Sequence, residues 1–261
     1  MRYFAGDISK YYESILRNIL HSYISGLNLM NKTIKCLHVH GRELRITGEE
    51  YALVRGPEIL LTCYIDDFAG QVFTVAPRSY TGRLLEILKM NLDNVFYRGI
   101  FYATINALVR YLGLLDKSCH CTNGYPELCG RELARFIIKS YGTSIRVLHA
   151  GYHPGHIVHL YNLLKDNILI TDLSLENIWN VKYNRMIYDG MYNDIFLNHV
   201  DLVLITGSSI INRTFWRMIH SSILSNKEVI VYGISATGAI ILLKKEKILP
   251  QKIKIFCPFS K

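Results

Sequence analysis

The first 115 residues contain two stretches with a helical spacing of apolar residues, separated by short alternating segments. Apolar residues recur every three or four positions over residues 7–23 and 96–112, which predicts two amphipathic helices. Between them, short runs punctuated by glycines predict an antiparallel meander. The expected strands are residues 33–40, 43–47, 51–54, 59–65 and 71–75, with a short helix at 81–90. We therefore expect an α+β domain over residues 1–115.

A different pattern begins after residue 130, where short apolar runs alternate with helical segments. The expected strands are residues 144–149, 167–171, 202–206, 228–232 and 252–256, with helices at 131–141, at 156–164, from 214 and at 238–243. Strands that alternate with helices are typical of a mainly parallel sheet with helices on both faces. We therefore expect an α/β domain over residues 116–261, which begins with a polar, cysteine-rich junction at residues 116–130.

Composition narrows the class of protein. The chain has 261 residues, of which 50% are hydrophobic and 20% charged, as in a folded globular protein. Its apolar runs are shorter than the roughly 18 residues that span a bilayer, and its N-terminus lacks a hydrophobic signal core. We expect a cytoplasmic protein without membrane contact. The net charge of +9 is dispersed along the chain, and without a recognition motif it favours a small anionic ligand over nucleic acid.

Cysteine and histidine are concentrated in the junction. In a chain of this length without a secretion signal, six cysteines favour reduced thiols or metal ligands over disulfides. Cys119 and Cys121 are too close for the usual metal-binding spacing. We therefore expect His120, Cys121 and Cys129 to hold zinc or iron, with Cys257 as a candidate fourth ligand. The alternative is a compact loop in which the cysteines are simply buried.

The segment from Val200 to Trp216 predicts a strand that runs into a polar turn and a helix start. Backbone N–H groups at a helix start carry partial positive charge and bind anions. The expected ligand contacts are Thr206, Gly207, Ser208, Ser209, Asn212 and Thr214. The alternative is that Ser209 or Asn212 caps the helix.

Two further strand-to-helix turns contain glycine, at Gly151 and Gly233. Asp172 ends the strand after Gly151, about 20 residues on, which is near the spacing of a ribose-binding acid in dinucleotide-binding folds. The glycine fingerprint of those folds is absent, and an ordinary loop cap is the alternative. Because such turns share the carboxyl edge of a parallel sheet, we expect one crevice. Its further contacts would be Gly151, Tyr152, His153, Asp172 and Gly233.

Several segments together resemble the heavy-metal chelation domain family, in which an enolase-N-terminal-like domain precedes a Rossmann-like domain. The matching stretches are GQVFTVAPRSYTG (70–82), YRGIFYATINALVRYLGL (97–114), HCTNGYPELCG (120–130), AGYHPGHI (150–157), TDLSLENI (171–178), DLVLITGSSIINRT (201–214) and YGISATGA (232–239). The resemblance implies that fold for residues 1–115 and 116–261, with a metal chelate in the cleft between the domains.

This chain departs from the family pattern at two positions. Val75 stands where similar proteins often have an acidic residue. Arg213 stands where they usually have glycine. A bulky cation at that helix start would either crowd a ligand or pair with an anionic one.

Two functions follow from these observations. The first is a binding protein that holds a small anionic molecule or metal chelate in the interdomain cleft. The second is an enzyme, a transferase or lyase, with a nucleotide-like cofactor near Asp172. The chain shows no recognisable set of acid, base and nucleophile, which favours binding. Catalytic residues, a scaffold role and homo-oligomer formation are left open.

Overall fold

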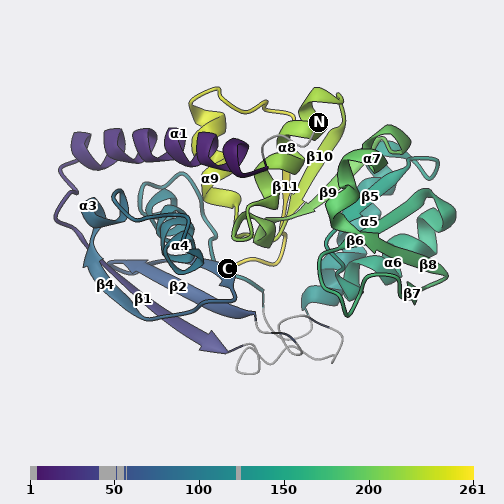
Figure 1. Cartoon of the computed structure of the whole chain (residues 1–261), viewed down its shortest axis with the longest axis horizontal. Helices are drawn as coiled ribbons and strands as arrows, with labels where there is room; N and C mark the ends of the chain where they lie inside the picture. Colours follow the sequence, from purple (N-terminus) through teal and green to yellow (C-terminus); the bar gives the residue numbers. More distant parts are fainter. Residues whose placement is uncertain (1–4, 41–50, 52–55, 57, 122–124) are drawn as a thin grey trace.

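The computed structural model describes residues 5–40, 51, 56, 58–121 and 125–261 (Figure 1). Of the strands expected at residues 43–47 and 51–54, only residue 51 lies within the described part of the chain. None of the described helices combines the length and the apolarity needed to cross a membrane.

The N-terminal part contains a four-stranded antiparallel sheet with the order β3-β2-β1-β4. Helix α4 packs against β2 and β3. The elements are α1 (Ala5–Gly26), β1 (Thr33–His40), β2 (Ile59–Ile65), β3 (Phe68–Thr74), β4 (Tyr80–Arg83), α3 (Leu84–Ile87) and α4 (Val95–Tyr111).

The rest of the chain forms a seven-stranded sheet with the order β11-β10-β9-β5-β6-β8-β7. All neighbouring strands are parallel except β7 and β8. The elements are α5 (Tyr125–Tyr141), β5 (Val147–Ala150), α6 (Pro154–Leu164), β6 (Ile168–Asp172), β7 (Val181–Lys182), β8 (Arg185–Asp189), α7 (Asn193–Phe196), β9 (Leu202–Thr206), α8 (Thr214–Leu224), β10 (Glu228–Tyr232), α9 (Thr237–Lys245) and β11 (Lys254–Phe256). Short 3₁₀ turns are η2 (Lys165–Asn167), η3 (Gly190–Tyr192), η4 (Leu197–His199) and η5 (Gly207–Ile210).

The expected fold class, an α/β chain with an antiparallel sheet followed by a mainly parallel one, is confirmed. The helix expected at residues 81–90 covers only Leu84–Ile87, because residues 80–83 pair with β1 as strand β4 and the helix ends before residue 88. The β7–β8 hairpin was not expected. Its strands lie at the edge of the sheet and are only partly buried, so apolar and polar residues show little alternation along them. The division into two domains at residue 115 stays a prediction.

A continuous apolar core connects the two sheets. It contains residues of α1 and α4 together with residues of α8, α9 and the parallel sheet. The Tyr12 ring stacks on Trp216 with 4.6 Å between the ring centroids, and Trp216 Nε1 donates a 3.0 Å hydrogen bond to the Tyr102 hydroxyl. A second cluster lies between α5, α6 and the other face of the parallel sheet.

The buried side chain of Asn106 ties this core to the turn before α9. Its Nδ2 donates to the carbonyl oxygens of Gln71, Ile234 and Ser235 at 2.9, 3.2 and 3.2 Å. Its Oδ1 accepts from the backbone N–H of Gly238 at 2.8 Å. One amide therefore joins α4, β3 and the turn after β10.

Cys36 and Cys63 form a disulfide, which corrects the expectation of reduced thiols for this pair. The two residues lie directly opposite each other on β1 and β2 and both are buried. The pairing depends on strand register, which cysteine spacing does not reveal. The other four cysteines are free.

We predict that Asn106→Leu lowers the free energy of unfolding by roughly 3–5 kcal/mol, because several buried backbone groups lose a partner at once. Urea denaturation measures the change. Asn18→Leu, on the exposed face of α1, is the matched control and should shift stability by less than about 0.5 kcal/mol. Similar losses for the two variants would contradict the role of Asn106.

Candidate functional site

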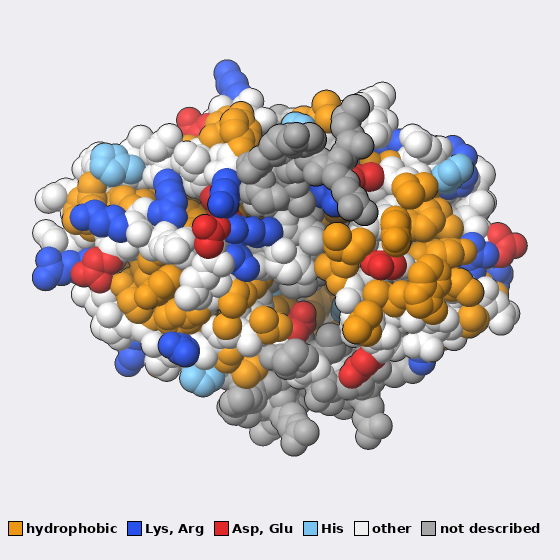
Figure 2. Space-filling model, viewed as in Figure 1, with side chains coloured by type: hydrophobic (Ala, Val, Ile, Leu, Met, Phe, Trp, Pro, Cys, Tyr) orange, Lys and Arg blue, Asp and Glu red, His pale blue; other side chains and the backbone are white. Residues whose placement is uncertain are grey.

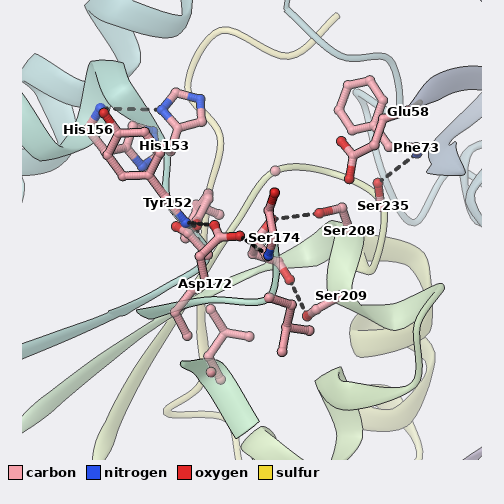
Figure 3. Close-up of a pocket in the computed structure, with 18 of the residues that line it drawn as sticks. Glu58, Phe73, Tyr152, His153, His156, Asp172, Ser174, Ser208, Ser209 and Ser235 are labelled. Carbon is pink, nitrogen blue, oxygen red and sulfur yellow. Dashed lines mark hydrogen bonds between the residues drawn. The ribbon is translucent and has the colours of Figure 1, made fainter. Parts of the chain in front are cut away.

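A cavity of about 520 Å³ lies at the carboxyl edge of the parallel sheet. The ends of β5, β6, β9 and β10 form one side, and residues of the N-terminal part, including Glu58 and Phe73, form another (Figure 3). The structure thus brings the expected turns together. The expected residues that line the cavity are Gly151, Tyr152, His153, Asp172, Thr206, Ser208, Ser209, Asn212, Thr214, Gly233, His120, Cys121 and Cys129.

Gly207 differs from the other expected contacts. It is buried and is not among the lining residues. A Cβ there would lie 3.0 Å from the carbonyl oxygen of Gly233 and 3.2 Å from the amide nitrogen of Ala236. Its lack of a side chain therefore lets two turns pack together, and we no longer expect it to face a ligand.

Gly151 meets two constraints at once. Its φ of +98° is a conformation that favours glycine. A Cβ would lie 2.8 Å from Thr206 Cγ2 and 3.1 Å from the Tyr232 hydroxyl. That hydroxyl donates to the Gly151 carbonyl oxygen at 2.7 Å. The turn is therefore held against β9 and β10 at the cavity wall.

Asp172 holds two loops in place. Its Oδ2 accepts from the backbone N–H of Tyr152 at 2.5 Å, and its Oδ1 accepts from that of Ser174 at 2.7 Å (Figure 3). Both carboxylate oxygens are therefore engaged by backbone donors. This geometry agrees with the alternative expectation, in which Asp172 caps a loop instead of binding a ribose.

The polar residues after β9 bond mainly to one another. Thr206 Oγ1 and Ser208 Oγ are 2.9 Å apart, and Ser209 Oγ donates to the Thr206 carbonyl oxygen at 2.6 Å. Asn212 Oδ1 accepts from the backbone N–H and the hydroxyl of Thr214 at 3.1 and 2.7 Å. These local bonds stabilise the start of α8, as the capping alternative expects.

Arg213 neither crowds the cavity nor pairs with a ligand there, which corrects the expectation. Its guanidinium forms ion pairs of 2.8 Å with Glu13 and 2.6 Å with Asp93, and it is not among the lining residues. Its φ of +68° turns the chain so that the side chain points toward α1. The residue therefore joins α1 to the start of α8.

Glu58 is a site residue that the sequence did not indicate. It comes from the segment before β2 and points into the cavity (Figure 3). Burial, and then the nearby Asp172, raise the pKa of its carboxyl to about 6. No local motif marks this residue, because only the tertiary structure brings it to the parallel sheet.

The described lining carries acidic but no basic charge. Its charged side chains are Glu58, Asp172 and Glu176, and no Lys or Arg is among the described lining residues. An anion in the cavity would therefore find no cationic side chain among these residues. The electrostatics favour a cation or a metal complex.

Three histidines gather beside the cavity with Tyr232. His149 Nε2 and His156 Nδ1 are 3.2 Å apart, and the rings of His153 and His156 are 3.9 Å apart between centroids. Burial lowers the pKa of His149 to about 3 and that of His153 to about 4. Burial also lowers the pKa of His156 well below its usual value, so all three rings are neutral near pH 7. Of these three histidines, only His153 was expected at the site from the sequence.

The cysteine-rich junction reaches the cavity differently from the expectation. The chain end pairs with it, because Lys261 N donates to the Cys119 carbonyl oxygen at 2.9 Å. Cys257 lines the same cavity as Cys121 and Cys129. Burial, and then the neighbouring Cys257, raise the pKa of the Cys121 thiol to about 12.

His120 does not converge with these thiols. Its ring packs on Phe73 at 4.0 Å between centroids, its Nε2 lies 3.5 Å from Ser235 Oγ, and its buried Nδ1 has no hydrogen-bond partner. Over the described part of the chain, no group of three or more His, Cys, Asp or Glu side chains is arranged to hold a metal ion. The structure therefore does not assemble the expected set of His120, Cys121 and Cys129 around one point.

A family model described as "Putative heavy-metal chelation" (DUF364) matches residues 160–248. This confirms the resemblance found in the sequence over that segment. No curated protein matches the chain.

Crystal structures similar to this chain include two of DUF364 proteins of unknown function. The one from Pyrococcus horikoshii has 14% identity and a TM-score of 0.54, and the match covers 91% of this chain and 83% of that one. The one from Desulfitobacterium hafniense has 16% identity and a TM-score of 0.44, with 72% of each chain covered. The first supports the fold.

We predict that Gly151→Ala lowers the free energy of unfolding by about 2 kcal/mol or more, because a side chain there adds backbone strain and a clash with Thr206. Gly142→Ala is the control, since Gly142 also has a positive φ, +79°, but open space around it. It should cost only about 1 kcal/mol. Equal losses in urea denaturation would show that the packing against Thr206 contributes nothing.

The second prediction concerns acid stability. As the pH falls from 6.5 towards 3, the unfolded chain binds a proton at His149 that the folded protein does not bind, so stability is present above pH 6.5 and is lost below it. In His149→Gln, the slope of unfolding free energy against pH should fall by about 1.4 kcal/mol per pH unit between pH 6 and ~4. His21→Gln, on the exposed face of α1, should leave the slope unchanged. An unchanged slope in His149→Gln would contradict the burial of a neutral imidazole.

Proposed function

We propose that this protein binds a metal ion that is carried as a complex with a small molecule. The main support for this proposal is the chemistry of the side chains that line the cavity. Every ionisable side chain in its described lining is a thiol, an imidazole, a phenol or a carboxyl, and no Lys or Arg lies among them. Thiols and imidazoles are ligands of soft and borderline metals. The family description, which names heavy-metal chelation, supports the same class of ligand.

A complex fits the cavity better than a bare ion. A volume of about 520 Å³ is in the range of small-molecule pockets. No three described protein ligands surround one point, so the protein would supply only part of the coordination sphere. We assign Cys121 and Cys257, whose thiols line the cavity and lie near each other, as the candidate protein ligands and Glu58 as the group that balances the positive charge. The small molecule would supply the remaining donors.

The finer architecture belongs to the same proposal. The ligand would lie between an enolase-N-terminal-like domain, residues 1–115, and a Rossmann-like domain, residues 116–261. Residues from both of these ranges, 1–115 and 116–261, line the cavity. The turns at Gly151 and Gly233 would then shape the ligand pocket, while the thiols would bond to the metal.

An enzyme is the second candidate, and Glu58 is the observation that favours it. A carboxyl with a pKa near 6 can accept and release a proton close to neutral pH. The nucleotide-like cofactor that this alternative requires has less support, because both oxygens of Asp172 already accept backbone hydrogen bonds. Mass spectrometry of a bound molecule before and after incubation distinguishes a catalyst from a carrier.

The test uses Cd²⁺, both alone and as its 1:1 complex with 2,2′-bipyridine, which stays positively charged. Calorimetry should detect binding of the complex, and thiolate-to-cadmium absorbance should appear. Cys121→Ser combined with Cys257→Ser should raise the dissociation constant about tenfold or more, equivalent to ~1.4 kcal/mol. Elemental analysis of protein purified without oxygen adds an independent measurement of bound metal.

Cys119→Ser is the matched control. Cys119 is also a free thiol of the junction, but it is not among the cavity-lining residues and its sulfur lies 3.9 Å from Arg110. Binding in this variant should equal that of the original protein. An unchanged dissociation constant after the double substitution, or a loss of binding in Cys119→Ser, would place the metal elsewhere.

A further inference from the structure

Large apolar side chains are exposed in one short segment of the chain. Of the ten in the described protein that are more than half exposed, six lie within residues 175–195, and Leu175 is 89% exposed. Soluble proteins usually have such residues singly. We call these six the hairpin face: Leu175, Trp179, Val181, Met191, Tyr192 and Ile195.

Contacts within the chain bring these residues to one end of the parallel sheet. The backbone N–H of Trp179 donates to the Ile187 carbonyl oxygen at 2.7 Å, which fixes Trp179 beside β8. The Tyr188 ring lies 6.3 Å from Trp179 and 5.2 Å from Phe196, the neighbour of Ile195. Strand β7 is the edge of the sheet in the described fold.

The loop that carries Leu175 lies against the turn that carries Met191 and Tyr192. A Cβ on Gly190 would approach the Asp172 carbonyl oxygen to 3.1 Å and Leu173 Cδ2 to 3.3 Å. Figure 2 shows a broad apolar area on the half of the molecule that contains β7 and β8. The hairpin face is therefore one region and not six scattered positions.

Its area approaches that of one side of a stable interface. Aromatic side chains have roughly 150–250 Å² of surface and aliphatic ones less, so the six together, all more than half exposed, present on the order of 600 Å². A typical protein interface takes about 800 Å² from each partner. The largest apolar patch of a typical monomer is ~300–600 Å².

The charges beside the hairpin face indicate which partner fits. Arg185 is paired with Asp166 at 2.8 Å, and Arg217 is paired with Asp194. These neighbouring charges are therefore neutralised within the chain. A nucleic acid or an acidic lipid surface would need unpaired basic residues around the patch. A second copy of the same apolar face meets no such requirement.

We propose that two copies of this chain associate through the hairpin face to form a symmetric dimer. In a two-fold interface the same patch lies on both subunits, so an apolar face is complementary to itself. The loops that carry the face also carry Ser174, Asn177 and Asn193, which line the cavity. Dimer formation would therefore stabilise the loops that form this part of the cavity wall.

Sedimentation equilibrium of the full chain, without ligand, tests this proposal independently of metal binding. The original protein should form a dimer. Val181→Lys and Ile195→Lys, made separately, should each raise the dimer dissociation constant about 100-fold or more, because two-fold symmetry brings two like charges into the apolar face. Both positions are exposed, so circular dichroism and melting temperature should show that the variants fold.

Leu27→Lys is the matched control, since Leu27 is also more than half exposed but follows α1 at the other end of the molecule (Figure 1). It should leave the dimer intact. A monomer at all concentrations would overturn the proposal, as would equal weakening by Leu27→Lys. If the monomer instead sediments with phosphatidylserine vesicles and Val181→Glu abolishes this, the face binds membranes and the dimer is refuted.

Discussion

The amide of Asn106 is the polar constraint on which the cavity depends. It is buried in α4 and satisfies three carbonyl oxygens and one N–H from two other parts of the chain. Buried backbone groups without partners are costly, so the turn after β10 has one favourable place against β3. That turn carries Ser235, whose hydroxyl accepts from the Phe73 N–H at 3.3 Å. Phe73 and Ser235 both line the cavity.

Close packing of glycine backbones completes the same arrangement. Gly207 lies against the turn of Gly233, and Gly151 lies against Thr206 and Tyr232. In each case a side chain would push two strand ends apart. Close packing between these turns therefore fixes the position of the cavity wall. The side chains that reach the cavity extend from this closely packed backbone.

Burial favours the uncharged forms of the thiols and imidazoles at the cavity. Burial keeps the histidines neutral and raises the pKa values of the Cys121 and Cys257 thiols. Thiols bind metals as thiolates, so binding a metal there would release protons. Glu58, whose pKa burial raises to about 6, gains its negative charge as the pH rises through that value.

The sequence by itself determined five of the seven strands of the mainly parallel sheet, β5, β6, β9, β10 and β11, and the turns at their carboxyl ends. Residues 202–206 and 228–232 form strands with the expected bounds, because buried parallel strands are short apolar runs ended by glycine or small polar residues. The meeting of Gly151, Thr206 and Gly233 at one edge followed from parallel topology alone. Asp172 was also placed correctly at this edge.

Only the tertiary structure decided which side chains share the cavity and which bond elsewhere. Glu58 reaches the parallel sheet from the segment before β2, and Cys257 reaches Cys121 because the chain end pairs with residues 118–119. Arg213 turns away to Glu13, and Cys36 meets Cys63 through strand register. These are contacts between residues far apart in the chain. Local hydrophobic periodicity carries no information about such contacts, because it reports only which face of each element is buried.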